Sequence, residues 1–206
     1  MLQLRTVTPY TLELLRKIQR LPCARETRLV GGTALALQYG HRQSVDLDFF
    51  GRLSEDIEQM EDELRSVGDL SILKSEKRIR LYEVNGIKVD FVDYSRYPWI
   101  DEAVKEEELT LASPKDIAAM KVNAVEGRGT KKDFMDVYEL LRHFSLQEIL
   151  SFYETKYPEH SVFRALISLT YFDDADKQMP PPVFSLPDWE TMKEGIRKAV
   201  DSYCEK

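Results

Sequence analysis

Two glycines followed at a fixed distance by two aspartates constrain this chain more than any other feature. Gly31-Gly32 follow a short apolar stretch, and thirteen residues separate them from Asp46-Leu47-Asp48. In an extended strand alternate side chains share a face, so Asp46 and Asp48 point to one side while Leu47 packs on the other. The pattern predicts a strand, a tight glycine turn, a short helix and a second strand that presents two carboxylates.

The same segment predicts chemistry on phosphates. Paired carboxylates on one face supply the oxygen ligands that a divalent cation such as Mg²⁺ prefers. Gly31 and Gly32 allow backbone amides to approach a phosphate closely, and the helix that begins at Thr33 would point its N-terminal amides at the same anion. Arg42 and Ser44 are placed to contact phosphate or nucleotide, although an ordinary loop arginine and a turn serine would look the same. We therefore expect a metal-dependent site that handles nucleotide phosphates.

A third carboxylate is expected from a neighbouring strand, because two metal ions about 4 Å apart need more oxygens than one pair of aspartates supplies. Asp90 is the best candidate, since its apolar neighbours within residues 88–92 predict a strand buried on one side, where an unpaired acid is costly. It could help to hold the catalytic metal and accept a proton from an attacking hydroxyl. The competing interpretation is a salt bridge with Arg78 or Arg80. Asp93 falls on the opposite face and is expected to be structural.

These motifs resemble the polymerase-beta-type nucleotidyltransferase superfamily and, within it, the AbiEii/AbiGii-type nucleotidyltransferase toxins of abortive-infection and toxin–antitoxin systems. The resemblance rests on two blocks, which are residues 31–37 with 41–50 and residues 111–121 continuing through Arg128 to 132–138. It implies a Mg²⁺-dependent enzyme that moves a nucleoside monophosphate from an NTP to a hydroxyl. It also implies an RNA acceptor such as tRNA and a cognate antitoxin protein.

The second block adds further site residues. The resemblance assigns Lys121, on a half-buried helix, to triphosphate binding, although a lysine there could also extend to solvent. Asp133 and Asp136 are i, i+3 neighbours that could orient Lys121 or Arg128, and the resemblance implies an active-site acid without deciding between the two. The expected catalytic residues are Asp46, Asp48, Asp90, Lys121, Asp133 and Asp136. The expected nucleotide-binding residues are Gly31, Gly32, Thr33, Arg42, Ser44, Lys121 and Arg128. The expected metal ligands are Asp46, Asp48 and Asp90.

The remaining pattern predicts an α+β fold. We expect residues 1–110 to form a nucleotidyltransferase core, with an N-terminal helix and a small mixed sheet, and residues 111–206 to form a helical region that packs on the core and closes the active-site cleft. Asn85-Gly86 predicts a tight hairpin because both residues tolerate positive φ. The expected strands are 28–30, 46–50, 71–73, 79–84 and 87–92, and the expected helices are 9–20, 34–38, 54–67, 113 onward, 130–142, 146–156, 159–171 and 188–203.

Composition narrows the class of protein. A net charge of −7 and a pI near 5.2 exclude a broad basic surface that coats nucleic acid. A local basic groove from Lys121, Arg128, Lys131 and Lys132 stays open, and the acidic runs 55–63 and 101–108 are expected to be solvated helix faces or loops. Cys23 and Cys204 predict no disulfide framework, and the three histidines are too dispersed for a zinc site. With no stretch apolar enough to cross a bilayer, we expect a cytoplasmic protein without membrane contact.

Two other functions fit the same acids. One is a small-molecule nucleotidyltransferase of the aminoglycoside-modifying kind, because cationic substrates would suit the negative surface. The other is a catalytically weak module of the same fold that senses nucleotide or docks a partner. The complete acid set of Asp46, Asp48 and Asp90 favours an active enzyme.

Overall fold

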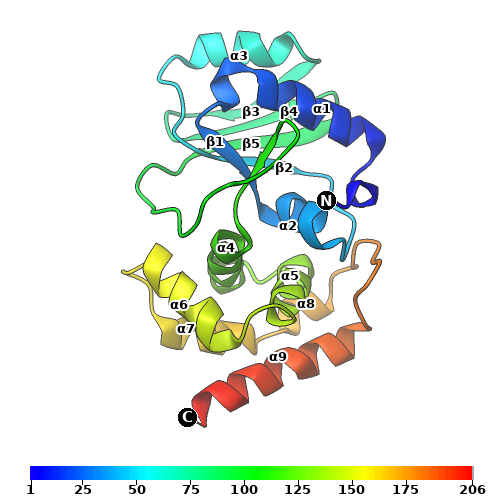
Figure 1. Cartoon of the computed structure of the whole chain (residues 1–206), viewed down its shortest axis with the longest axis vertical. Helices are drawn as coiled ribbons and strands as arrows, with labels where there is room; N and C mark the ends of the chain where they lie inside the picture. The colour runs from blue at the N-terminus through cyan, green and yellow to red at the C-terminus, as the bar shows by residue number, and fades with distance from the viewer. Residues whose placement is uncertain (206) are drawn as a thin grey trace. The chain divides into compact units, whose positions relative to one another are not determined.

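The computed structural model describes Met1–Glu205 and has two compact units. The first unit contains 1–97 and 102–112, and the second contains 98–101 and the residues from 113 onward. Strands are confined to the first unit, whereas the second is built from helices (Figure 1). This mixed composition confirms the predicted α+β class.

A seven-stranded mixed sheet forms the centre of the first unit, in the order β3-β4-β5-β2-β1-β7-β6. β2 runs parallel to β5 and antiparallel to β1, and β1 runs parallel to β7. The strand that carries the paired aspartates therefore lies in the middle of the sheet. The strands are β1 Thr27–Val30, β2 Leu47–Gly51, β3 Leu70–Ser75, β4 Ile79–Val84, β5 Ile87–Asp93, β6 Val104–Glu106 and β7 Leu109–Leu111.

Three α-helices complete this unit, α1 Pro9–Arg20, α2 Gly31–Tyr39 and α3 Ile57–Arg65. α1 begins after Thr8, whose hydroxyl accepts a hydrogen bond from the Thr11 amide, as expected for an N-cap. The helix expected over 54–67 does not begin at Ser54. Asp56 caps α3 instead, because its carboxylate accepts from the Gln59 amide while the Ser54 hydroxyl accepts from the amide of Asp56 itself.

The β4–β5 hairpin has the predicted turn. Asn85 and Gly86 have φ values of 53° and 77°, the positive values that a two-residue turn of this kind requires. The β6–β7 hairpin, in contrast, was not predicted from the sequence, since the acidic run 101–108 reads as loop or solvated helix. β7 pairs with β1 through Leu29 and Leu111, so a long-range contact with a buried strand organises this short hairpin.

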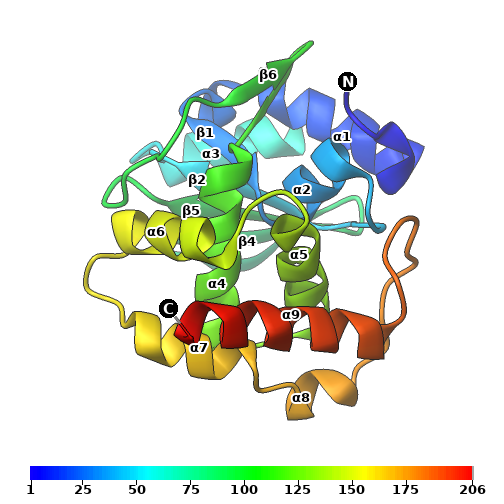
Figure 2. The ribbon, with the colours of Figure 1, turned by 60° about the horizontal axis from the view of Figure 1, so that its bottom comes forward.

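The second unit is helical, with α4 Pro114–Gly127, α5 Lys131–Leu141, α6 Leu146–Lys156, α7 Val162–Leu169, α8 Asp173–Asp176 and α9 Trp189–Cys204. α4 packs against α5, α6 and α7, and α9 crosses α5 (Figure 2). Apolar side chains from these helices form one core, which includes Phe134, Leu150, Phe172 and Ile196. The predicted helix 159–171 is shorter than expected because Ser161 caps it, accepting from the Arg164 amide.

The segment 98–101 belongs to the helical unit although its neighbours on both sides belong to the sheet unit. Asp116 and Lys156 are fully buried and form an ion pair of 2.8 Å. The Lys156 ammonium also donates to the Pro98 carbonyl at 2.6 Å and lies over the Trp99 ring, and the Ile100 amide donates to Asp116 at 2.9 Å. These contacts with Asp116 and Lys156 explain why 98–101 belongs to the helical unit, which the sequence did not predict.

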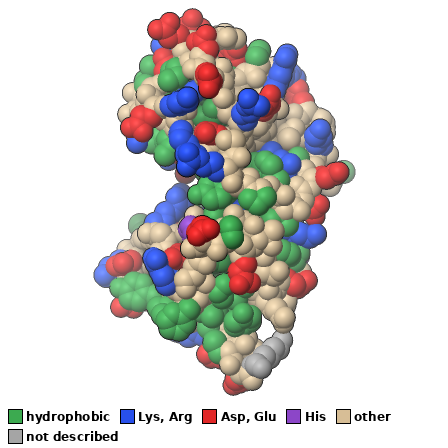
Figure 3. Space-filling model, turned by 90° about the vertical axis from the view of Figure 1, so that its left-hand side faces the viewer, with side chains coloured by type: hydrophobic (Ala, Val, Ile, Leu, Met, Phe, Trp, Pro, Cys, Tyr) green, Lys and Arg blue, Asp and Glu red, His purple; other side chains and the backbone are tan. Residues whose placement is uncertain are grey.

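On the face drawn in Figure 3, basic and acidic side chains are interspersed. Hydrophobic side chains gather on the lower part of the same view. Within Met1–Glu205, no helix combines the length and apolar character needed to cross a membrane.

Candidate active site

The first structural feature of the candidate site is a pair of carboxylates on adjacent strands. In the parallel pairing of β2 with β5, Asp48 lies directly beside Asp90, and Leu47 lies beside Val89. Residues in register on neighbouring strands project to the same face of a sheet, so the Asp48 and Asp90 side chains share one face. Asp46 comes just before β2 and, two residues from Asp48, falls on that face as well.

Gly31 makes room for the Asp48 carboxylate. Its φ is +69°, and a β-carbon at this position would lie 2.6 Å from Asp48 Oδ2. Both the backbone conformation and the close approach therefore require glycine. The sequence predicts a glycine turn before a helix from Thr33, whereas Gly31 and Gly32 form the first turn of α2 itself.

Thr33 and Ser44 hold the loop that leads into the acids. The Thr33 side chain is buried, and its hydroxyl contacts both the Ser44 hydroxyl, at 2.8 Å, and the Asp46 carbonyl. Arg42 is also buried and donates to the Gln43 carbonyl at 2.9 Å. These contacts order the loop between α2 and β2, while the predicted role of these side chains in nucleotide binding stays a prediction.

Asp90 is paired with a lysine on the same strand face, which was not among its predicted partners. Lys88 Nζ lies 2.7 Å from Asp90 Oδ2, and the side chains come from alternate positions of β5. The alternative salt bridges of Asp90 with Arg78 or Arg80 do not form. Arg78 pairs with Asp93 at 3.4 Å, and the fully buried Arg80 donates to the Ser54 carbonyl and to Met60 sulfur.

All three acids act on Lys88. Burial alone would lower the pKa of the Lys88 ammonium, but the hydrogen bond and charge of Asp90, followed by the charges of Asp48 and Asp46, raise it above its ordinary value. The ammonium therefore lies within electrostatic reach of each predicted metal ligand. Pairing within one strand at i, i+2 was the sequence signal that could have identified Lys88.

The carboxylate oxygens of the three acids are the groups that would bind a divalent ion. Asp90 Oδ1 is buried and has no hydrogen-bond partner among the described residues, which is costly for a carboxylate oxygen unless a ligand satisfies it. Oxygen donors from Asp46, Asp48 and Asp90 suit a hard cation such as Mg²⁺. Within 1–205, however, no three acidic, histidine or cysteine side chains already form a closed ligand set. The donors fit the ion in their chemistry.

A second polar cluster lies inside the helical unit. Lys121 Nζ on α4 lies 3.0 Å from Asp133 Oδ1 and 2.7 Å from Asp136 Oδ2, both on α5. Both carboxylates are completely buried, and Arg128 binds Asp133 through two hydrogen bonds of 2.8 and 2.9 Å. The predicted contacts of these acids with Lys121 and Arg128 are thus present, and Lys121 uses both aspartates.

Thr130 joins this cluster in an unexpected way. Thr130 directly precedes α5, where the sequence would predict that its side chain caps the helix. Its hydroxyl makes no cap hydrogen bond and donates instead to Asp133 Oδ2 at 2.5 Å. Burial by itself would raise the pKa of Asp133, yet the charges and hydrogen bonds of Lys121, Arg128 and Thr130 hold that pKa well below its usual range. Asp133 is therefore a permanently ionised carboxylate at neutral pH.

The possible basic groove from four neighbouring cations does not assemble as one surface. Lys121 is buried against its two acids, and Lys131 is buried with its ammonium 5.0 Å from the centre of the Trp189 ring. Lys132 is half-buried, and only the Arg128 side chain is largely exposed, at 59%. Helical periodicity separates Lys131 from Lys132, because adjacent residues on a helix do not share a face.

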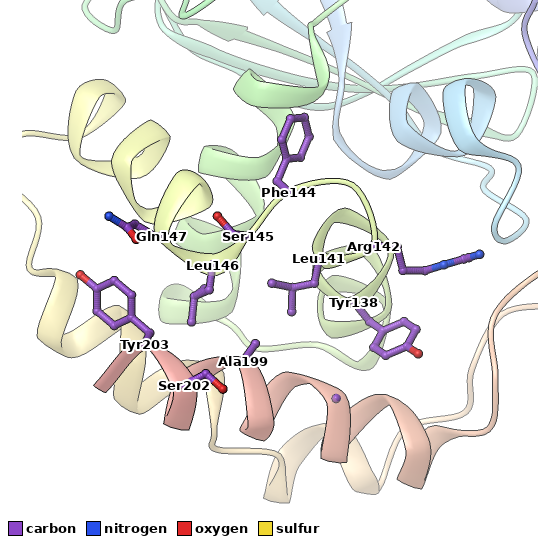
Figure 4. A pocket seen from close by; sticks show the side chains of 11 residues that line it. Tyr138, Leu141, Arg142, Phe144, Ser145, Leu146, Gln147, Ala199, Ser202 and Tyr203 are labelled. Atoms are coloured by element: carbon purple, nitrogen blue, oxygen red, sulfur yellow. The ribbon is translucent and has the colours of Figure 1, made fainter. Parts of the chain in front are cut away.

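A pocket of about 370 Å³ opens in the helical unit, between α5, the start of α6 and α9 (Figure 4). Tyr138, Leu141, Leu146, Ala199 and Tyr203 give it a mostly apolar lining, to which Arg142, Ser145 and Gln147 add polar groups. None of the predicted catalytic acids lines this pocket. It does not have the donor set for metal-dependent chemistry.

Comparison with known proteins decides the family. The model of the family described as "Nucleotidyl transferase AbiEii toxin, Type IV TA system" matches residues 13–205. The chain belongs to this AbiEii family. A protein of Aquifex aeolicus (strain VF5), described only as uncharacterized protein aq_aa25, is 33% identical over 199 residues, which cover 94% of this chain and 95% of that protein.

Solved structures agree on the fold. JHP933 from Helicobacter pylori superimposes with a TM-score of 0.56 at 18% identity, over 97% of this AbiEii-family chain and 94% of that one. The antibiotic-resistance factor ANT(2'')-Ia gives a TM-score of 0.54 at 15% identity, over 70% and 89% of the two chains. The membership of the chain in a nucleotidyltransferase family is thus accompanied by a shared fold, and both confirm the resemblance found in the sequence.

Proposed function

We propose that this AbiEii-family protein transfers a nucleoside monophosphate from an NTP to an acceptor hydroxyl, with Asp46, Asp48 and Asp90 holding two Mg²⁺ ions. The observation that carries the proposal is the register of Asp48 beside Asp90 on parallel central strands. Bound there, the ions would neutralise charge that develops on the reacting phosphate and hold the attacking and leaving oxygens.

The protein's own groups supply the remaining functions. The N-cap residue of α2, Val30, makes no side-chain cap hydrogen bond, and the amides of Gly31, Gly32 and Thr33 at this helix N-terminus would donate to a phosphate. Asp90 Oδ1, buried and without a partner among the described residues, is the atom that would accept the proton of the attacking hydroxyl. Family resemblance assigns Lys121 to the triphosphate, with Asp133 and Asp136 as the acids that fix its position.

The family supports the biological role that we propose. The AbiEii model describes toxins of type IV toxin–antitoxin systems, which supports a growth-arresting activity restrained by a cognate antitoxin protein. An RNA such as tRNA is the acceptor that we propose. Expression of the wild-type chain, but not of an Asp48→Asn variant at equal level, is then expected to stop bacterial growth.

One transfer assay tests the proposal. The purified chain is incubated with each α-labelled NTP, Mg²⁺ and either total RNA or a panel of aminoglycosides, and is compared with Asp48→Asn and with the charge-matched control Asp62→Asn, whose carboxylate is exposed on α3. We expect label on RNA from the wild type and Asp62→Asn only. Label on a cationic drug would indicate that the acceptor is a small molecule and not RNA. NTP binding without transfer to any acceptor would overturn the catalytic proposal in favour of a sensing module.

A further inference from the structure

Lys88 already occupies the electrostatic position that a metal ion would take. Its ammonium forms a 2.7 Å ion pair with Asp90, and its own position on β5 directly precedes Val89, the register partner of Leu47. Asp46 directly precedes Leu47, so the strand pairing brings Asp46 toward Lys88 just as it brings Asp48 beside Asp90. The Lys88 ammonium thus pairs with Asp90, and the charges of Asp48 and Asp46 also act on it.

The pairing of Lys88 is selective. Glu83 lies directly opposite Lys88 on β4, yet the ion pair goes to Asp90 along the same strand. The Lys88 side chain is 48% exposed whereas that of Asp90 is 12% exposed, so the lysine reaches from the solvent side over a mostly buried acid. An ammonium held in this way can leave toward water without disturbing the packing of β5.

The Lys88 ammonium leaves the Asp90 carboxylate incompletely satisfied. It binds Oδ2, while the buried Oδ1 is still without a partner among the described residues. A divalent cation brings twice the charge of an ammonium and prefers several carboxylate oxygens. The ammonium and the metal therefore compete for the same oxygens.

We propose that Lys88 is a built-in counter-cation of the acid group, which leaves Asp90 when a divalent ion is taken up and so weakens the apparent affinity for that ion. The inference rests on the metal site of the proposed function. In the metal-free protein Lys88 screens the mutual repulsion of Asp46, Asp48 and Asp90, and on metal uptake its ammonium moves into solvent or toward the bound substrate.

Metal binding itself provides the test. Mn²⁺ affinity is measured by calorimetry or by the loss of the free-ion EPR signal for the wild type, Lys88→Met, Lys88→Arg and the control Lys74→Met, a similarly exposed strand lysine paired with Glu76. We expect Lys88→Met to bind Mn²⁺ about tenfold more tightly, and Lys88→Arg and Lys74→Met to resemble the wild type. In EDTA, Lys88→Met is expected to melt at a lower temperature and to regain more stability from Mn²⁺ than the wild type does.

A second measurement needs no variant. Brief acetylation followed by mass spectrometry reports the accessibility of each lysine, and we expect Mg²⁺ to increase modification of Lys88 while that of Lys74 stays constant. Unchanged or weaker Mn²⁺ binding by Lys88→Met, with wild-type binding that Asp48→Asn abolishes, would overturn the role of Lys88 and leave the metal site intact. Absence of Mn²⁺ binding by both the wild type and Lys88→Met at millimolar ion would overturn the metal site itself.

Discussion

Gly31 and Asp48 are in such close contact that the glycine has no substitute. A β-carbon on Gly31 would stand 2.6 Å from Asp48 Oδ2, and the φ of +69° disfavours any other residue. The turn between β1 and α2 and the carboxylate on β2 are therefore a single structural unit. A side chain added in the turn would therefore displace the Asp48 carboxylate.

Replacement of Gly31 by alanine is the sharpest test of this unit. We expect Gly31→Ala to lower nucleotidyl transfer by about a hundredfold, because the displaced carboxylate misplaces the reacting groups. The left-handed backbone should cost about 1–2 kcal/mol of stability. The matched control is Gly86→Ala, which has φ of +77° but no atom within 4 Å of the added carbon. The Gly86→Ala variant should lose similar stability and keep its activity. An equal loss of activity in Gly31→Ala and Gly86→Ala would show that backbone strain alone, and not displacement of the carboxylate, lowers activity.

The buried cluster around Lys121 predicts a large effect on stability. Lys121→Met leaves the fully buried Asp133 and Asp136 without their shared cation, and we expect a loss of about 3–5 kcal/mol in the free energy of unfolding. Lys177→Met serves as control, since its pair with Asp174 is exposed and should contribute less than about 1 kcal/mol. Urea denaturation measures both. A Lys121→Met protein as stable as the control would contradict the structure.

Acid should weaken the protein through Asp133. The folded-state pKa of this carboxyl is depressed, so its contribution to stability is complete above the unfolded pKa of about 4 and is lost as the pH falls toward the lower folded value. We expect the unfolding free energy of the wild type to decline below about pH 4 more steeply than that of Asp133→Asn, which is less stable at neutral pH. Parallel pH profiles for the two proteins would refute the assignment.

The two cysteines should differ in reactivity. Burial, followed by a hydrogen bond to Glu63 and the charge of that carboxylate, raises the pKa of the Cys23 thiol to about 12, whereas Cys204 is exposed. Because the thiolate is the reacting form, a maleimide at pH 7.5 should label the native chain once. Cys204→Ser should abolish this fast labelling, and unfolding in urea should restore one reactive thiol. Rapid labelling of Cys23 in the folded variant would contradict the structure.

Local signals in the sequence predict much of this fold. Ser113-Pro114 begins α4 as expected, with the Ser113 hydroxyl accepting from the Asp116 amide, and Asn85-Gly86 makes the hairpin turn. Such features depend on a few adjacent residues and are therefore readable from sequence. The predicted order of a sheet-bearing region followed by helices rests on the same kind of periodicity.

What the sequence did not predict depends on contacts between distant residues. The close approach of Gly31 to Asp48 joins residues that are 17 positions apart, and β7 of the β6–β7 hairpin pairs with the distant strand β1. The register of β2 with β5 places Asp48 beside Asp90, whereas the partner of Asp90 is Lys88 on the same strand and neither of the arginines that the sequence offered. The roles of the three acids in metal binding stay predictions.

The excursion of 98–101 into the helical unit means that the covalent chain passes from one unit to the other three times. A helical fragment started at Ser113 would keep the buried pair of Asp116 with Lys156 but would lack the Ile100 amide and the Pro98 carbonyl that bind these two side chains. A single cut in the gene therefore cannot yield both units with all of their residues.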